Sequence, residues 1–425
     1  MPASRTRSLG LVGLGIVASG LLANVYLAII ARSVPAADYA YFGAFWSLVL
    51  LAGFGVFLPV EQETARLLQT AGRRPLGVIR AALLTSASMA IAQLALLAVS
   101  WPLLVDAFGG HSMTVVALGV ICLVSAGQFV VRGALIGMDR MGRHALIMLF
   151  DSVLRVTFAA IVAVVVAEPG SAEFAWTLVV AMALAHAPQL LSLLRKRTRA
   201  TTEPDPTLGY LGSRAVASAV APLLLGSLCA QLLLNGPPII VPALAQAGVE
   251  ATQAGQFVAA YTLARIPLFL VVPLQSALLP LLAGVLDGAQ PGTVVTMLRR
   301  TTAGLVVLAV AALLIGYFAG PWLVALVFGP AYVLEGWHVA LLAVGVAAYI
   351  GLVLLTQVMV AAVRHAMVAW SWLSAVVVGV VVVILVPDLL LRVELGFLIG
   401  SATGWLVATV LVRIGGRARE LQEVH

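Results

Sequence analysis

Charged residues are scarce in this sequence, and their scarcity indicates whether the folded chain lies in water or in a membrane. Only 10% of the 425 residues are Asp, Glu, Lys or Arg, whereas 62% are hydrophobic and the mean hydropathy is +1.10. A soluble domain carries about 25% charged residues. Apolar runs of about twenty residues recur along the chain, and such a run crosses about 30 Å of hydrocarbon as a helix. The composition therefore excludes a soluble globular domain and predicts an all-α polytopic membrane protein.

Cysteine and lysine are nearly absent as well. The two cysteines, Cys122 and Cys229, each lie inside an apolar run and are interpreted as buried thiols rather than a disulfide. Lys196 is the only lysine, and the arginines are spread over many predicted loops, which argues against a nucleic-acid patch. The sequence shows no metal-ligand cluster, P-loop or glycine-rich nucleotide loop. We therefore expect no metal, no cofactor, no nucleic-acid partner and no enzymatic activity.

The apolar runs between polar breaks predict twelve transmembrane helices. They cover approximately residues 8–31, 39–60, 79–105, 112–136, 146–167, 173–194, 213–246, 252–284, 300–325, 336–362, 366–386 and 391–412. The first run is longer than the roughly 7–15 residues of a cleavable signal peptide, so it is interpreted as a retained span.

The basic residues orient these helices. With the N-terminus inside, 20 of the 24 basic residues, Arg132 among them, fall in inner segments. Only Arg32 and Arg392 fall in outer segments, which also hold acidic residues such as Glu335 and Glu394. Positive charge concentrates on the cytoplasmic side of membrane proteins. The distribution therefore predicts that both termini are cytoplasmic.

Two internal echoes indicate a duplication. Residues 41–68 resemble residues 256–283, with Phe42 matching Phe257 and Pro59 matching Pro273, and "GRHALI" at 142–147 resembles "VRHAMV" at 363–368. Both offsets are about half the chain. We therefore expect an N-terminal six-helix lobe (1–194), a cytoplasmic linker (195–212) and a C-terminal six-helix lobe (213–425). Because six is even, the lobes would be parallel repeats, an arrangement associated with transporters that bind substrate in a central cleft between lobes.

The first helix pair carries a family resemblance. Arg32, Pro35, Asp38, Tyr39 and Phe42 form an R-x-x-P-x-x-D-Y-x-x-F turn between the first two spans, and "EQETAR" closes the second span. This pattern resembles Wzx-type polysaccharide-biosynthesis flippases of the multidrug/oligosaccharidyl-lipid/polysaccharide exporter (MOP) superfamily. The resemblance implies a twelve-helix transporter of polyprenyl-linked glycans. A second likeness, of "GALIGMDRMGRHALIM" (133–148) to a loop of major facilitator transporters, is interpreted as a short cytoplasmic turn, because it follows the fourth span rather than the second.

Arg265 is the strongest candidate site residue, because it lies within the apolar eighth span. A charge near mid-bilayer costs about 2.5–3.5 kcal/mol on insertion scales, so it should face a cavity or a partner. Tyr261 and Phe257 precede it by one and two helical turns. Arginine matches phosphate oxygens bidentately, and we expect Arg265 and Tyr261 to bind a phosphate. The alternative is a structural pair with a carboxylate.

Uncharged polar residues accompany it in other spans. Asn24 lies in the first span, and Gln231 and Asn235 share a face of the seventh. They are predicted either to line the substrate cavity or to form interhelical hydrogen bonds. The prolines of "NGPPIIVPALAQ" (235–246) should bend or break the seventh helix, and Pro267, Pro273 and Pro280 should do so in the eighth.

Two groups of charged residues are candidates for ion pairs or gates. Asp151 and Arg155 are four residues apart in the fifth span and should neutralise each other. Glu61, Glu63 and Arg66 close the second span. They are interpreted either as an inner gate that pairs with arginines of the other lobe or as a solvated helix end.

The residues and the resemblance together predict a flippase of the bacterial inner (plasma) membrane. It would move a polyprenyl-phosphate-linked sugar or oligosaccharide to the outer leaflet for cell-envelope polysaccharide synthesis, by alternating access. Its partners would be the polyprenyl-(di)phosphate-linked glycan, membrane lipids and glycan-synthesis enzymes. The lipid II branch of the superfamily rings its cavity with several arginines, so a single deep arginine leaves a monophosphate or a diphosphate carrier open.

Two alternatives remain. The first is a multidrug or small-solute exporter of the same superfamily or of the major facilitator class, although the first span carries Asn24 where drug antiporters usually place a carboxylate. The second is a scaffold of an envelope-synthesis complex that transports nothing, although short loops leave it little surface for partners.

Overall fold

The chain folds as a set of long apolar helices, as predicted. The computed structural model describes residues 3–69, 75–195, 213–268, 293–362 and 364–422. Among these residues nine helices are long and apolar enough to cross a membrane, and one bent helix pair would make a tenth. Helices satisfy every backbone polar group within the segment, which lipid requires. The all-α polytopic prediction is confirmed, and twelve spans are consistent with it.

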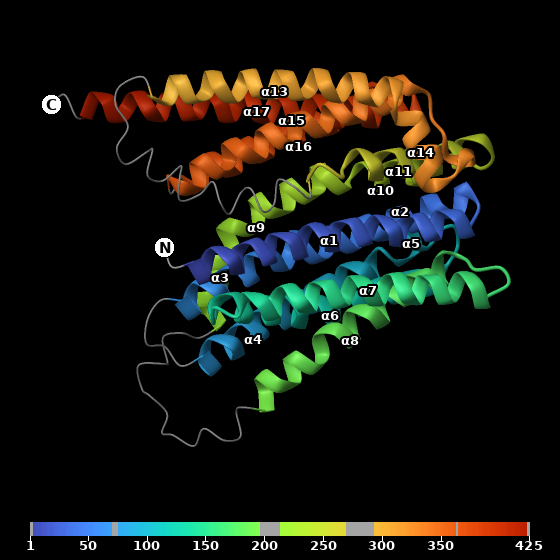
Figure 1. Ribbon diagram of the computed structural model, residues 1–425, viewed down its shortest axis with the longest axis horizontal. Helices are drawn as coiled ribbons and strands as arrows, with labels where there is room; N and C mark the ends of the chain where they lie inside the picture. Colours follow the sequence, from blue (N-terminus) through green and yellow to red (C-terminus); the bar gives the residue numbers. More distant parts are fainter. Residues whose placement is uncertain (1–2, 70–74, 196–212, 269–292, 363, 423–425) are drawn as a thin grey trace. The chain divides into compact units, whose positions relative to one another are not determined.

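Two compact units make up the chain, Met1–Gln231 (the first unit) and Leu232–His425 (the second unit). The described residues of the first unit form these α-helices: α1 (Ala3–Ser33), α2 (Ala36–Leu50), α3 (Val56–Gln69), α4 (Pro75–Val99), α5 (Trp101–Ala107), α6 (Ser112–Gly137), α7 (Met141–Val165), α8 (Ser171–Arg195) and most of α9 (Ser213–Asn235). Helix α1 packs along α7, and α6 packs against α3, α4 and α8 (Figure 1).

The second unit contains the end of α9 and the helices that follow it. They are α10 (Pro237–Leu244), α11 (Val249–Ala264), α13 (Thr293–Phe318), α14 (Gly320–Phe328), α15 (Gly336–Ala361), α16 (His365–Leu385) and α17 (Leu389–Gln422). Helix α17 packs against both α15 and α16, and α13 packs on α15 (Figure 1). The contact of α16 with α17 is close because its glycines carry no side chain: a Cβ added at Gly400 would lie 2.6 Å from the Ala375 carbonyl oxygen. Small residues bring membrane helices together in this way.

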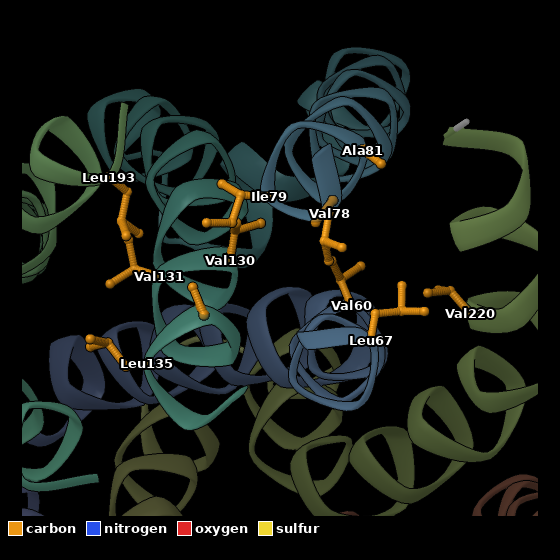
Figure 2. Close-up of a cluster of buried hydrophobic side chains, with 12 residues drawn as sticks. Val60, Leu67, Val78, Ile79, Ala81, Val130, Val131, Leu135, Leu193 and Val220 are labelled. Atoms are coloured by element: carbon orange, nitrogen blue, oxygen red, sulfur yellow. The ribbon is translucent and has the colours of Figure 1, made fainter. Parts of the chain in front are cut away.

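A buried apolar cluster holds several helices of the first unit together. Figure 2 shows Val60 and Leu67 of α3 near Val78 of α4, while Val130 of α6 lies beside Ile79. Further members come from α8 and from the part of α9 that belongs to this unit: Leu193 and Val220. The side chains interdigitate as in any protein interior, where van der Waals contact is gained over many atom pairs. This cluster fixes α3 and α6 side by side.

The second predicted span is one long helix interrupted by a π-helical segment, Leu51–Gly55, between α2 and α3. Pro59 follows within α3 and removes one backbone donor. Side chains reach the backbone at this point, since Gln93 Nε2 donates to the Ala52 carbonyl at 3.0 Å and Ser227 Oγ donates to the Phe54 carbonyl at 2.9 Å. Such π segments are rare and often lie at functional sites.

The seventh predicted span is broken where its prolines lie. Helix α9 ends at Asn235, α10 begins at Pro237, and the two axes differ by 52°. The cause is local, because Pro237 and Pro238 cannot donate to the carbonyls one turn earlier. The eighth span leaves helical geometry after Ala264, and Pro267 lies in the turn that follows. Pro273 and Pro280 lie outside the described residues, as does the match of Pro273 to Pro59.

The two sequence echoes lie at equivalent points of the helices that the structure describes. Phe42 on α2 and Phe257 on α11 have no exposed surface. The "GRHALI" segment overlaps the start of α7, and "VRHAMV" overlaps the start of α16. The "GALIGMDRMGRHALIM" segment is divided between helices, because its first residues end α6 and its last residues begin α7. Asp139, in the turn between them, has a φ of 55°.

Candidate functional site

Arg265 lies where α11 ends, beside the last residues of α9, which belong to the second unit. It is the C-cap of α11, and its guanidinium reaches Asn235, the last residue of α9. Arg265 Nη1 donates to Asn235 Oδ1 at 3.0 Å, and Arg265 Cζ lies 4.7 Å from the centre of the Tyr261 ring. Arg265 is 8% exposed and Asn235 is fully buried. Because the C-terminus of a helix carries partial negative charge, the end of α9 favours a cation beside it.

The Tyr261 hydroxyl completes this arrangement by binding the broken backbone of α9. In a continuous helix the N–H of residue 238 would donate to the carbonyl of Leu234. Pro238 has no N–H, and the Tyr261 hydroxyl donates to that carbonyl instead, at 2.7 Å. The Tyr261 ring stacks on Phe257 with centroids 5.8 Å apart and meets Phe397 edge to face at 5.4 Å. We call Leu234, Asn235, Tyr261 and Arg265 the break cluster.

The break cluster contains three of the five residues predicted to bind substrate. The single Tyr261 hydrogen is engaged with the Leu234 carbonyl, so in this structure it is not available as a donor to a phosphate.

Asn24 and Gln231, the other two, belong to the first unit. Asn24 Nδ2 donates to the Gly20 carbonyl one turn earlier in α1 at 2.9 Å, and its Oδ1 atom is buried with no hydrogen-bond partner among the described residues. Gln231 is half-buried, one turn before Asn235 on α9. The structure thus assembles Arg265, Tyr261 and Asn235 into one cluster.

Glu61 forms a buried ion pair inside the first unit. Arg132 of α6 approaches it with Nε 2.9 Å from Oε2, and the two residues are 8% and 6% exposed. The Arg132 guanidinium also lies over the rings of Phe54 and Phe129, at 5.2 and 4.9 Å from the ring centres. The charge count assigned Arg132 to an inner segment, and the structure buries its side chain within the unit. A long α6 buries this arginine because its partner lies on the neighbouring helix.

The interpretation of Glu61 and Glu63 as a solvated helix end was wrong. Both are buried, Glu63 at 5% exposure, and Glu63 pairs with the exposed Arg66 at 2.7 Å on the same helix. Glu61 takes its partner from its own unit rather than from the other half of the chain. The reason is the close packing of α3 on α6, where a Cβ added at Gly133 would lie 2.6 Å from the Glu61 carbonyl oxygen.

Asp151 and Arg155 form the predicted ion pair on α7. Arg155 Nε donates to Asp151 Oδ1 at 3.1 Å, and Arg155 Nη2 pairs with Asp151 Oδ2. The Arg155 guanidinium lies 5.8 Å from the Trp46 ring centre on α2. Two buried histidines, His144 and His186, lie within electrostatic reach of each other and of Arg132. Two ion pairs with little exposed surface, Glu61–Arg132 and Asp151–Arg155, thus lie within the first unit.

Sequence reasoning missed one further pair, His338 and Glu394 of the second unit. His338 Nδ1 lies 2.7 Å from Glu394 Oε1, and Glu394 has no exposed surface. The charge count assigned Glu394 to an outer segment, and the structure buries its side chain completely. The sequence offered one signal for this pair. Glu394 lies near the start of α17 and His338 near the start of α15, and both fall inside predicted spans.

An apolar groove also lies on the second unit, away from the break cluster. Its lining comes from α13 and α15: Leu313, Leu314, Tyr317, Phe318, Trp337, Ala340 and Leu341. Most of these side chains are exposed on a helix of which little is buried within the protein, which is typical of a surface that faces lipid. The described residues hold no cluster of three or more His, Cys, Asp or Glu side chains able to bind a metal ion.

Known proteins with similar sequences and structures show the family and the fold of this chain. No protein-family model matches the sequence. The chain is 30% identical over 398 residues to the uncharacterized protein Rv1510 of Mycobacterium tuberculosis strain H37Rv, an alignment that covers 89% of this chain and 85% of the relative. It belongs to the Rv1510 family. The same identity and coverage relate it to uncharacterized protein MT1558/MT1560 of strain CDC 1551.

Solved structures show which fold this member of the Rv1510 family adopts. An inward-facing multidrug resistance MATE family transporter of the MOP superfamily matches with a TM-score of 0.65 at 13% identity, over 96% of this chain and 98% of that one. A MOP superfamily transporter from Pyrococcus furiosus matches with a TM-score of 0.62 at 14% identity (97% and 96% covered). A mutant form of the Vibrio cholerae MATE transporter VcmN gives 0.62 at 14% identity (98% of each chain). The chain therefore has the two-lobed fold of MATE transporters and is a multi-pass membrane protein.

Proposed function

We propose that this protein is an exporter of the MOP superfamily, which carries an amphipathic substrate outward by alternating access. The break cluster is the single observation that carries the proposal. Transporters commonly build substrate sites where a membrane helix is broken, because irregular backbone and helix ends there can meet polar groups. A buried arginine at such a break is costly unless it serves a partner or a substrate.

The charge of Arg265 sets the class of substrate we propose. A guanidinium repels cations and attracts carboxylate, sulfonate or phosphate groups. One solved MOP transporter with this fold is described as having a binding pocket of reverse polarity that suggests a different function. The fold therefore accommodates binding pockets of more than one polarity. We propose a small amphipathic solute that is neutral or anionic.

The flippase predicted from the sequence is the second candidate. The Arg32–Phe42 turn favours it through the Wzx-type resemblance, and Arg265 would bind the phosphate of a polyprenyl-linked sugar. Outward movement of one negative charge gains about 2.3 kcal/mol per 100 mV of inside-negative potential. Such a substrate would need no coupling ion. Under this candidate the protein would act in the inner membrane beside glycan-synthesis enzymes.

Reconstitution into vesicles tests the proposal and separates the two candidates. Wild type, Arg265→Ala and Arg265→Lys would be assayed with an anionic amphipathic dye, a cationic dye of similar size and a fluorescent polyprenyl-phosphate sugar. We expect transport of the anionic dye, its loss in Arg265→Ala and partial retention in Arg265→Lys, since lysine keeps the charge but loses the planar fork. Movement of the lipid-linked sugar alone would select the flippase.

Arg143→Ala is the matched control, because Arg143 is exposed at the start of α7. It should transport at the wild-type rate. Thermal stability of all variants is measured in parallel. If Arg265→Ala unfolds early, Arg265 is a structural part of the break cluster. If it transports normally, the substrate assignment is refuted.

A further inference from the structure

Three exposed arginines lie at one end of the second unit. Arg299 and Arg300 are near the start of α13, and Arg413 is near the end of α17. The part of α13 that is apolar enough to cross a membrane begins at Thr296, and that of α17 ends at Ile414. Each arginine is therefore within four residues of the point where its helix leaves the hydrocarbon. Lipid headgroups lie at this depth.

Close packing on α15 brings these two helix ends to the same level. A Cβ added at Gly351 of α15 would lie 2.6 Å from Leu305 Cδ2 of α13 and 3.2 Å from Trp405 Cδ1 of α17. Figure 1 shows α13 and α17 along α15, with the start of α13 and the end of α17 on the same side. Arg300 is five residues from the α13 contact, and Arg413 is eight residues from the α17 contact. At a rise of about 1.5 Å per residue, these arginines lie about 8 and 12 Å beyond the contact, at similar depth.

These arginines give this end of the unit a positive charge. None of the three forms an ion pair with another residue that the structure describes. Arg364, in the turn after α15, adds a charge at the same end, and Glu420 follows Arg417 and Arg419 in the last turns of α17. The other acidic residues that the structure describes in this unit lie near the starts of α11, α15 and α17, at the opposite end: Glu250, Glu335, Asp388 and Glu394. The basic end therefore attracts anions.

An apolar face of α13 runs from the arginines into the membrane. Only 6% of the most apolar stretch of α13 is buried within the protein. Val306, Val307 and Val310 are 56%, 69% and 51% exposed. One leaflet supplies about 15 Å of hydrocarbon, which corresponds to about ten residues of helix. A lipid whose headgroup meets Arg300 would therefore lay its acyl chain along these valines.

We propose that this surface binds an anionic phospholipid of the surrounding membrane, and we call it the lipid surface. Its members are the three arginines at the helix ends and the valines that follow on α13: Arg299, Arg300, Arg413, Val306, Val307 and Val310. The guanidinium groups donate to the phosphate oxygens, and the valines pack against an acyl chain. A zwitterionic headgroup also carries an ammonium group, which arginines repel, so the surface favours a lipid with net negative charge. The proposal does not depend on the substrate that the protein exports.

Energy transfer in detergent micelles measures this selectivity. Purified full-length protein in maltoside receives dansyl-labelled phosphatidylglycerol, or phosphatidylcholine with the same label and acyl chains, and its tryptophans are excited. An arginine near the membrane surface strengthens the binding of an anionic lipid about fivefold, so we expect phosphatidylglycerol to bind at least about tenfold more tightly. The difference should shrink in about 1 M salt, where the Debye length is about 3 Å. Equal affinity for the two lipids at low salt would overturn the proposal.

Variants that remove charge locate the binding. Arg299→Gln with Arg300→Gln should weaken the binding of phosphatidylglycerol about 25-fold, and Arg413→Gln about fivefold, whereas the affinity for phosphatidylcholine should not change. The matched control is Arg140→Gln with Arg143→Gln, which removes the same charge at the start of α7 in the first unit and should bind as wild type does. An equal loss in the control would show attraction to net charge alone and would overturn the proposal. Wild-type affinity in the Arg299→Gln, Arg300→Gln variant would overturn it as well.

Two further measurements separate charge from shape, and a lipid from free phosphate. Arg299→Lys with Arg300→Lys keeps both charges and should retain most of the affinity, whereas a loss as large as that of the glutamine pair would refute the role of charge. All of these side chains are exposed, so the melting temperature should not change; if the glutamine pair unfolds early, Arg413→Gln and the lysine pair decide. Glycerol phosphate at the concentration of the lipid should not displace it, because it has no acyl chain. Displacement would show a phosphate site in which the valines play no part, and the lipid assignment would be wrong.

Discussion

The Tyr261→Phe substitution isolates one hydrogen bond of the break cluster. Phenylalanine keeps the ring that stacks on Phe257, meets Phe397 and lies under Arg265. It removes only the hydroxyl that donates to the Leu234 carbonyl at 2.7 Å. Because Pro238 supplies no N–H, that carbonyl would be left without its donor in a partly buried site.

The expected cost follows from the chemistry of an orphaned acceptor. A buried group that loses its only partner costs about 1–3 kcal/mol. In a unit of this size each kcal/mol lowers the melting temperature by about 2–4 °C, so the predicted decrease is about 2–12 °C. The assay is thermal unfolding of the purified protein in detergent, followed by tryptophan fluorescence.

Tyr317→Phe is the control for this substitution. Its side chain is 52% exposed, so losing its hydroxyl should change stability by less than about 0.5 kcal/mol. If Tyr261→Phe melts at the wild-type temperature, the hydroxyl does not compensate for the missing proline donor. The structural role assigned to Tyr261 would then be refuted, and its hydroxyl would again be open to a role in substrate binding.

Three further predictions concern the first unit. Arg132→Ala should destabilise the protein by about 3–5 kcal/mol, because Glu61 would remain buried without its cation. The double variant Arg132→Met with Glu61→Leu should recover most of that loss. If thermal unfolding shows no recovery, the pairing of Arg132 with Glu61 is contradicted. Gly133→Ala should cost about 1–3 kcal/mol, since its Cβ would lie 2.6 Å from the Glu61 carbonyl oxygen, whereas Gly142→Ala, where a Cβ meets nothing within 4 Å, should be near neutral in the same assay. For the topology, His111→Cys should react with an impermeant thiol reagent applied to intact cells and Arg140→Cys should not; the opposite pattern would invert the predicted orientation.

Properties that depend on local sequence were predictable in this protein. The membrane environment follows from hydropathy, and the helices follow from the need to satisfy backbone groups in lipid. The break between α9 and α10 follows from two adjacent prolines, and the Asp151–Arg155 pair follows from one helical turn. Each of these needs only residues that are close together in the chain.

Tertiary structure alone decided which polar groups meet across helices. Arg132 and Glu61 are 71 residues apart, and His338 and Glu394 are 56 apart. Hydropathy predicts that a segment crosses the membrane, but it fixes neither the rotation of a helix about its axis nor its neighbours. Those depend on close packing, such as the approach of α3 to α6 at Gly133. Arg132 and Glu394 lie inside predicted spans, near their ends, and they are buried because packing gives each of them a partner that offsets the loss of water.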